Sequence, residues 1–126
     1  MGYRSDVTIA IYGDTEPFAT FKDEATQRFK AIYSDDEIYL RESEFKTCFS
    51  WDPNFFLFEV EGWKWYEEYP AVQFYEGLLD LAAELGLNAE FIRVGDEFED
   101  VETKYRGDDI EYRLGVERRI VINDHN

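Results

Sequence analysis

The sequence predicts an α+β fold, a mainly antiparallel sheet with two helices on one of its faces. Short runs in which apolar and polar residues alternate predict strands, and two longer runs with apolar residues at helical spacing predict helices. No Pro- or Ser-rich linker and no internal repeat divides the 126 residues, so we expect a single domain over residues 1–126. The order of the runs predicts a ferredoxin-like βαββαβ core with extra strands.

The first half of the chain begins with a strand and a helix. Residues 6–13 place Val7, Ile9 and Ile11 on one face of a strand that ends at a glycine. Residues 16–33 carry apolar side chains at helical spacing, which predicts a helix packed across the sheet.

Two further strand regions follow this helix. Residues 37–51 alternate twice and predict one bent strand or a tight hairpin, before a turn at residues 52–54. Residues 55–66 are apolar on both faces at their start, which predicts an interior strand, and Gly62 is expected to mark a bulge.

The second half contains the clearest helix pattern. Residues 70–86 begin with proline and end with glycine, and the predicted buried stripe is Phe74, Leu78, Leu81, Ala82 and Leu85. Residues 88–95 and 110–122 predict two more strands. The acidic residues 95–109 between these two strands are expected to form a loop or a short helix.

The charge of the chain narrows its partners. The sequence has 29 acidic and 13 basic residues, a net charge of -16, and residues 59–111 contain 16 carboxylates but four Lys or Arg. Such a surface repels nucleic acid and anionic membranes, so we expect neither to bind directly. A basic protein is the expected partner; the alternative is that the charge serves solubility.

Catalytic and cofactor motifs are missing from the sequence. The one histidine is His125 and the one cysteine is Cys48, which leaves no pair for nucleophilic catalysis and no intramolecular disulfide. No nucleotide-binding or zinc motif occurs. We therefore expect a non-enzymatic protein with no catalytic residue, cofactor or metal ligand. A lone cysteine and the lack of a secretory signal or spanning run favour the cytoplasm.

The acidic run "GDEFEDVETKYRGDD" invites a metal interpretation. An EF-hand loop started at Asp96 would have phenylalanine at position three and glycine at position twelve, so it fails. A looser divalent-ion site at Asp96, Asp100, Asp108 and Asp109 is the alternative, and with it a small carboxylate-based metal-binding protein or enzyme. The favoured interpretation is a solvated acidic loop that forms part of a docking face.

Aromatic and acidic residues together favour a protein-binding surface, because Trp and Tyr are enriched at interface hot spots and carboxylates steer basic partners. In the predicted second helix, Glu76, Asp80 and Glu84 recur every four residues with no Lys or Arg in that helix, so a basic partner would relieve their repulsion. The alternatives are core packing of the tryptophans, an ordinary polar helix face, and a sugar groove with paired carboxylates. The predicted partner-binding residues are Trp63, Trp65, Tyr66, Glu67, Glu68, Glu76, Asp80, Glu84, Asp96, Glu97, Asp100, Asp108 and Asp109.

Two finer hypotheses follow from the charge. Duplex DNA carries one charge per ~1.7 Å of axis, so sixteen charges correspond to roughly 27 Å, which is about the size of this domain. If the charges are clustered, they suffice for a nucleic-acid mimic. A basic patch at Arg113, Arg118 and Arg119 could instead meet an acidic patch of another copy and form a homo-oligomer.

The opening "MGYRSDV", continuing into "TIAIYGD", resembles the start of small uncharacterised proteins encoded by phages, prophages and other bacterial mobile elements. The resemblance covers about a tenth of the chain and transfers no residue roles. It implies a bacterial or phage origin, where an acidic inhibitor of a basic nucleic-acid-binding protein would be a plausible activity.

Overall fold

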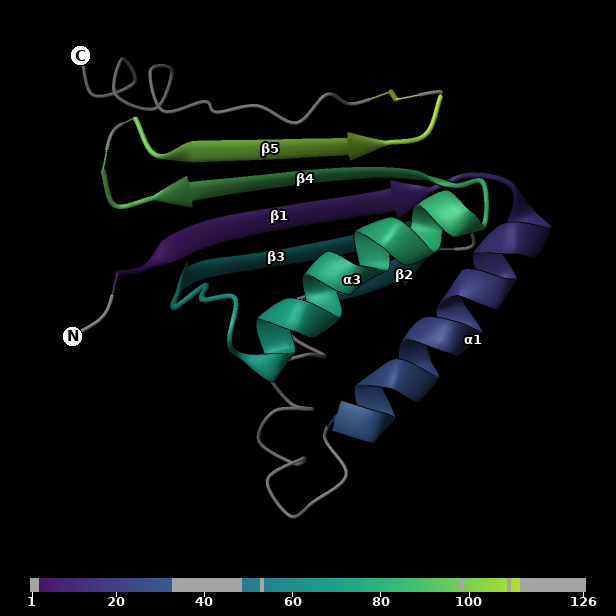
Figure 1. Cartoon of the computed structure of the whole chain (residues 1–126). Helices are drawn as coiled ribbons and strands as arrows, with labels where there is room; N and C mark the ends of the chain where they lie inside the picture. The colour runs from purple at the N-terminus through teal and green to yellow at the C-terminus, as the bar shows by residue number, and fades with distance from the viewer. Residues whose placement is uncertain (1–2, 33–48, 53, 98, 109, 112–126) are drawn as a thin grey trace.

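The computed structural model describes residues 3–32, 49–52, 54–97, 99–108 and 110–111. Within these ranges, two helices cover one face of a five-stranded antiparallel sheet, which confirms the predicted α+β class (Figure 1). The strand order is β2-β3-β1-β4-β5. The elements are β1 (Ser5–Tyr12), α1 (Thr15–Ile32), β2 (Phe49–Asp52), β3 (Phe55–Trp63), α3 (Pro70–Glu84), β4 (Asn88–Gly95) and β5 (Val101–Arg106).

The core lies between the sheet and the two helices. β1 is the middle strand, and Ile9 stands in register with Phe58 of β3 and Phe91 of β4. All three side chains are fully buried. α1 contributes Phe18, Phe21, Ala25 and Phe29, whose helical spacing places one apolar face against the sheet.

α3 ends in a Schellman motif. The Leu87 N–H donates to the Ala82 carbonyl at 2.8 Å, and the Gly86 N–H donates to the Ala83 carbonyl at 3.1 Å. Gly86 has a φ of 75°, the left-handed conformation that the sequence pattern anticipated. The chain then enters β4 with Leu87 buried in the core.

Several boundaries agree with the sequence. β1, α1, α3 and β4 lie within one or two residues of their predicted limits, and β3 is an interior strand as expected. The β1–β3 register shifts between Ser5 and Val7, opposite the segment that contains Gly62, so the predicted bulge is confirmed. The described elements follow the order β, α, β, β, α, β, β, whereas the sequence pattern predicted β, α, β, β, β, α, β, β, and the ferredoxin-like assignment stays a prediction.

β5 corrects the interpretation of the acidic run. We expected a loop or short helix over residues 95–109, but Val101–Arg106 pairs with β4 as a strand, from Val94↔Val101 to Ala89↔Arg106. Its β-branched and aromatic side chains alternate with charged ones, which is a strand pattern that the charge density obscured.

Other predictions fall outside the described residues. They are most of the strand or hairpin over residues 37–51, nearly all of the final strand over residues 110–122, and the roles of Cys48, His125, Arg113, Arg118 and Arg119. No helix in the described ranges is long and apolar enough to cross a membrane.

Two glycines of the α3 region should respond oppositely to the same substitution. No described atom lies within 4 Å of a Cβ built at Gly77, so Gly77→Ala should stabilise the protein by about 0.5–1 kcal/mol through helix propensity. Gly86→Ala should instead destabilise it by about 1–2 kcal/mol, because its left-handed backbone disfavours a Cβ.

Urea unfolding followed by circular dichroism measures both free energies. The wild-type chain is the common reference, and equal effects of the two substitutions would contradict the predicted helix interior and cap.

Candidate functional site

The carboxylates predicted on α3 face basic residues of β5. Lys104 Nζ lies 2.7 Å from Glu76 Oε1, and Arg106 Nε lies 3.6 Å from Asp80 Oδ1. The prediction that this row lacks salt-bridge partners is therefore wrong for Glu76 and Asp80, because the strand that supplies the partners was not predicted. Glu84 is exposed and makes no ion pair or hydrogen bond with the described residues.

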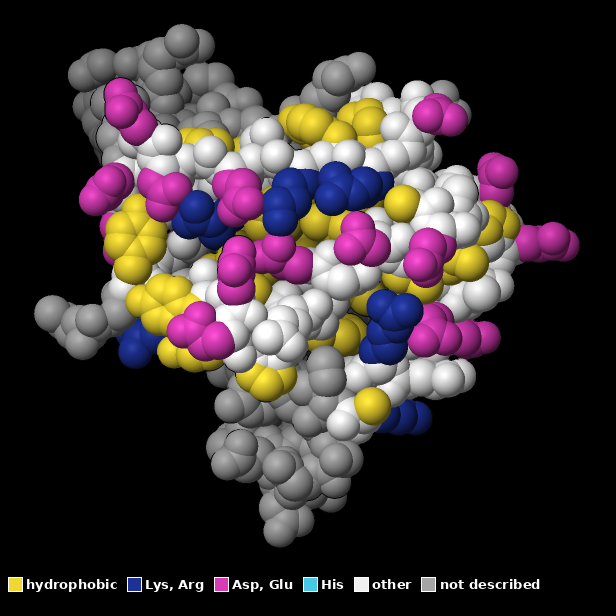
Figure 2. Space-filling model, viewed as in Figure 1, with side chains coloured by type: hydrophobic (Ala, Val, Ile, Leu, Met, Phe, Trp, Pro, Cys, Tyr) yellow, Lys and Arg dark blue, Asp and Glu magenta, His cyan; other side chains and the backbone are white. Residues whose placement is uncertain are grey.

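The ion pairs continue along β5 toward its start. Lys104 Nζ lies 3.5 Å from Glu102 Oε2, and Arg93 Nε lies 3.1 Å from Glu102 Oε1. Arg93 also holds Asp100 with both terminal nitrogens, at 2.8 Å and 3.1 Å. Figure 2 shows Lys and Arg side chains in a row between β5 and α3, with Asp and Glu along both sides. Asp100, predicted to bind a partner, is thus held by an internal cation.

These contacts shift the pKa values of the cations upward. The hydrogen bond to Asp100 raises the pKa of Arg93. Burial opposes this increase, and the contact with Glu102 raises the pKa further. Burial alone would lower the pKa of Lys104, but the hydrogen bonds and negative charges of Glu76 and Glu102 together raise it above its ordinary value. Both side chains are therefore stabilised in their charged form.

The two predicted tryptophans belong largely to the core. Trp65 is 9% exposed, and its Nε1 donates to Glu76 Oε2 at 2.8 Å. Its ring packs near Tyr75 and Phe91. Trp63 is half-buried, with its ring edge-on to Tyr75. Trp65 is therefore part of the hydrophobic core, as the core-packing alternative expected, and only a small part of its surface is exposed.

Tyr3 joins two loops that lie far apart in the sequence. Its backbone N–H donates to the Tyr66 hydroxyl at 2.6 Å, in the loop between β3 and α3. Its own hydroxyl donates to Asp100 Oδ2 at 2.6 Å and accepts from the Glu97 N–H at 3.0 Å, in the turn between β4 and β5. The hydrogen bond to Asp100 raises the pKa of Tyr3. A Cβ on Gly95 would overlap both Tyr3 and Asp100, so glycine is needed there.

Tyr3 thereby brings five of the predicted residues to one end of the sheet. Tyr69 packs against Tyr66 at 5.3 Å between ring centroids and is 39% exposed. Large hydrophobic side chains at this end of the molecule have carboxylates around them (Figure 2). We call this surface the acidic end, and its residues are Tyr3, Tyr66, Glu67, Glu68, Tyr69, Asp96 and Glu97.

The aspartates of the metal alternative do not meet. Asp100 precedes β5 and Asp108 follows it, and six residues of extended chain at ~3.3 Å each span roughly 20 Å. Asp96 and Asp100 therefore cannot share an ion with Asp108. Asp109 lies outside the described residues. In the part of the chain that is described, no group of three or more Asp, Glu, His or Cys is placed to hold a metal ion.

The sequence analysis did not single out Glu90, a fully buried carboxylate on the sheet face opposite the helices. The Tyr12 hydroxyl donates to Glu90 Oε2 at 2.5 Å and accepts from the Glu111 N–H at 2.7 Å. Asn88 and Ile92 lie two residues on either side of Glu90 in β4 and so share its face of the sheet, but nothing in this pattern indicates that a carboxylate there is buried.

No protein-family model matches the chain, and no curated protein or solved structure matches it either.

Lys104 gives a test of the ion-pair row through its pH dependence. Lys104→Met should lower the free energy of unfolding by about 1–2 kcal/mol at pH 7, because it leaves the half-buried Glu76 with less compensation. The folded-state pKa of Lys104 is raised, so its charge contributes fully below the unfolded value of about 10.4. That contribution disappears as the pH rises through the folded-state value.

The difference between wild type and Lys104→Met in urea unfolding should therefore be constant from pH 7 to about 9 and shrink above about 10.5. Lys30→Met, at an exposed position in the last turn of α1, is the matched control and should show a small difference throughout. A gap that does not narrow at high pH would show that the amine charge contributes nothing.

Proposed function

We propose that this protein is a non-enzymatic acidic binding module whose acidic end docks a basic protein. The proposal rests on the hydrogen bonds of Tyr3, which hold two carboxylate-bearing loops beside the exposed ring of Tyr69. An aromatic anchor surrounded by carboxylates is the composition expected of a surface that recognises Lys- and Arg-rich partners.

The internal ion pairs support placing the docking surface at this end. Residues 59–111 contain four Lys or Arg, and Arg93, Lys104 and Arg106 all lie in the row between β5 and α3. The positive charges of these three residues therefore neutralise carboxylates on the helix-covered face of the sheet. Glu67, Glu68, Asp96 and Glu97 are exposed at the acidic end.

Docking of a basic protein fits this distribution better than close mimicry of a nucleic acid. A duplex presents an uninterrupted row of negative charges. Here the α3 carboxylates Glu76 and Asp80 alternate with cations, which breaks such a row along the helix. A more specific hypothesis is that the protein mimics a nucleic acid and thereby inhibits a basic nucleic-acid-binding protein. This hypothesis is tested separately below, by elution with duplex DNA.

The test compares two variants that remove the same amount of charge. The site variant carries Glu67→Gln, Glu68→Gln, Asp96→Asn and Glu97→Gln. The control carries Asp14→Asn, Glu16→Gln, Asp23→Asn and Glu59→Gln, all at exposed positions outside the predicted binding residues. Each tagged protein is used to capture partners from bacterial lysate in about 0.1 M and then about 0.5 M salt.

The wild type and the control should retain a stoichiometric basic partner at the lower salt, and the site variant should retain at least about tenfold less, because desolvated charges near an anchor contribute most. Elution of that partner by duplex DNA would support mimicry. Equal losses in both variants would assign the interaction to overall charge, and capture of no basic partner by the wild type would remove the proposal.

A further inference from the structure

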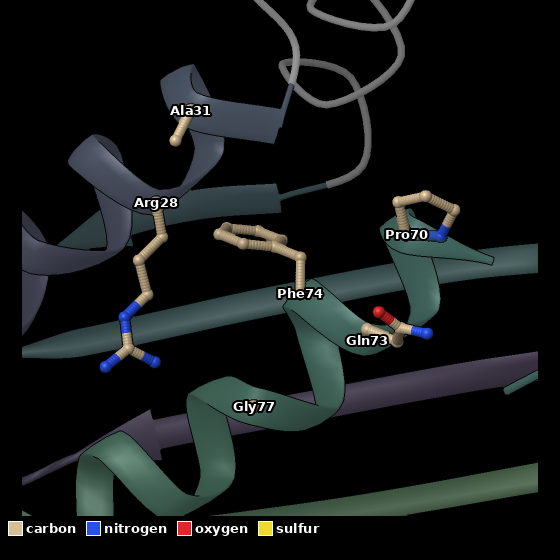
Figure 3. Close-up of a pocket in the computed structure, with 6 residues that line it drawn as sticks. All are labelled: Arg28, Ala31, Pro70, Gln73, Phe74 and Gly77. Atoms are coloured by element: carbon tan, nitrogen blue, oxygen red, sulfur yellow. The ribbon is translucent and has the colours of Figure 1, made fainter. Parts of the chain in front are cut away.

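An open groove of about 350 Å³ lies between α1 and α3, away from the ion-pair row. Its lining residues are Arg28 and Ala31 from α1, and Pro70, Gln73, Phe74 and Gly77 from α3. Figure 3 shows the Phe74 ring directed from α3 toward α1, with Pro70 near one end of the groove and the Arg28 guanidinium near the other. The volume is at the lower end of the range of small-molecule pockets, roughly 300–1,000 Å³.

Gly77 keeps the groove open at a cost to the helix. Glycine inside a helix is less favourable than alanine, and no described atom lies within 4 Å of a Cβ built there. Packing with the described residues therefore does not require glycine at this position. The space above the Gly77 backbone belongs to the groove, so a long side chain such as leucine at residue 77 would fill much of it, whereas a single methyl group would take up little.

Phe74 provides the apolar floor of the groove. It is 5% exposed and packs edge-on against Phe29 of α1, with 5.9 Å between ring centroids. Gln73 is fixed by its side-chain nitrogen, which donates to the Glu67 carbonyl at 2.9 Å. An apolar group placed over Phe74 would thus meet a surface whose side chains are already held in place.

Arg28 is the charged residue of the groove, and it determines the ligand chemistry. Its Nε pairs with Glu24 Oε2 at 3.1 Å on the same helix. Its two terminal nitrogens make no hydrogen bond or ion pair with the described residues. That pair of N–H donors matches the two oxygens of a carboxylate.

We propose that this groove binds a small amphipathic carboxylate, with its apolar part over Phe74 and Gly77 and its carboxylate on the terminal nitrogens of Arg28. At roughly 30 Å³ per water-sized group, the groove holds about a dozen heavy atoms. Exposed carboxylates farther than about 8 Å from the groove oppose an anion only weakly, because they are screened at physiological salt. Glu24, which pairs with Arg28 at 3.1 Å, lies closer and opposes the anion. The proposal does not depend on the basic partner of the acidic end.

The test uses three probes with one apolar part: phenylbutyrate, phenylbutanol and phenylbutylamine. Each is titrated into the ¹⁵N-labelled full chain at about 0.15 M salt, and amide chemical shifts report both affinity and position. Phenylbutyrate should bind most tightly, with its largest shifts at the amides of Ala31, Gln73 and Gly77. Tighter binding of the amine or the alcohol, shifts centred elsewhere, or no shift at millimolar phenylbutyrate would overturn the proposal.

Variants then separate the carboxylate contact from the apolar one. Arg28→Gln should weaken phenylbutyrate binding about tenfold and leave phenylbutanol unchanged, since a charge-assisted pair is lost. Glu24→Gln removes the same intrahelical ion pair but keeps the guanidinium, so it should not weaken phenylbutyrate. An equal loss in both variants would show that the ion pair acts only on the helix and would overturn the assigned contact.

Gly77→Leu should weaken the acid and the alcohol alike, at least about tenfold, because its side chain fills the groove. Gly77→Ala is the matched control for a change at this position, and a spectrum with the wild-type dispersion confirms that each variant is folded. Unchanged binding by a folded Gly77→Leu variant would place the ligand outside the groove.

Discussion

The contact between Lys104 of β5 and Glu76 of α3 determines how the acidic half of this chain packs. Glu76 also accepts from the indole nitrogen of Trp65, and Lys104 lies 5.2 Å from the centroid of the Phe91 ring. One carboxylate therefore ties together a helix, a strand and the loop that leads into the helix. A half-buried carboxylate without such partners would be costly, so the contact also fixes the register of β5. A slip of one residue would move Lys104 and Arg106 to the other face of the sheet.

The ion pairs of these cations determine which carboxylates of the acidic half are neutralised within the protein. Arg93, Lys104 and Arg106 lie along the helix-covered face, where they neutralise carboxylates that are close in space but distant in sequence. The loops at the ends of the strands receive no comparable set of cations from residues 59–111. Glu67, Glu68, Asp96 and Glu97 remain exposed in two of these loops, and Tyr3 orders the two loops against each other. An ordered acidic surface costs less entropy on binding than a mobile one of the same composition.

The sequence was most informative where structure depends on local pattern. α3 and β4 could be predicted to within one or two residues, because spacing, a starting proline and a closing glycine are all local signals. β5 was not predicted because its period of two, in which Thr103 and Tyr105 alternate with charged residues, lies inside a run dense in carboxylates. The contact of Asp100 with Tyr3 could not be predicted, since Tyr3 lies 97 residues away from it. Composition therefore predicted some residues of the acidic end. Which carboxylates remain exposed depends on ion pairs between β4, β5 and α3, which composition does not reveal.

α3 shows how tertiary packing overrides the local rules for helix stability. Its N-cap residue Tyr69 makes no side-chain capping hydrogen bond, its first turn has no acidic residue and its last turn has no basic one. Glu84 near its C-terminus opposes the helix dipole, and Gly77 interrupts its middle. The helix nevertheless buries seven side chains, and that burial is what holds it in place. Because burial provides the stability, the exposed side of α3 can carry locally unfavourable residues. Gly77 is one of these residues. Because it has no side chain, the groove between α1 and α3 stays open beside it.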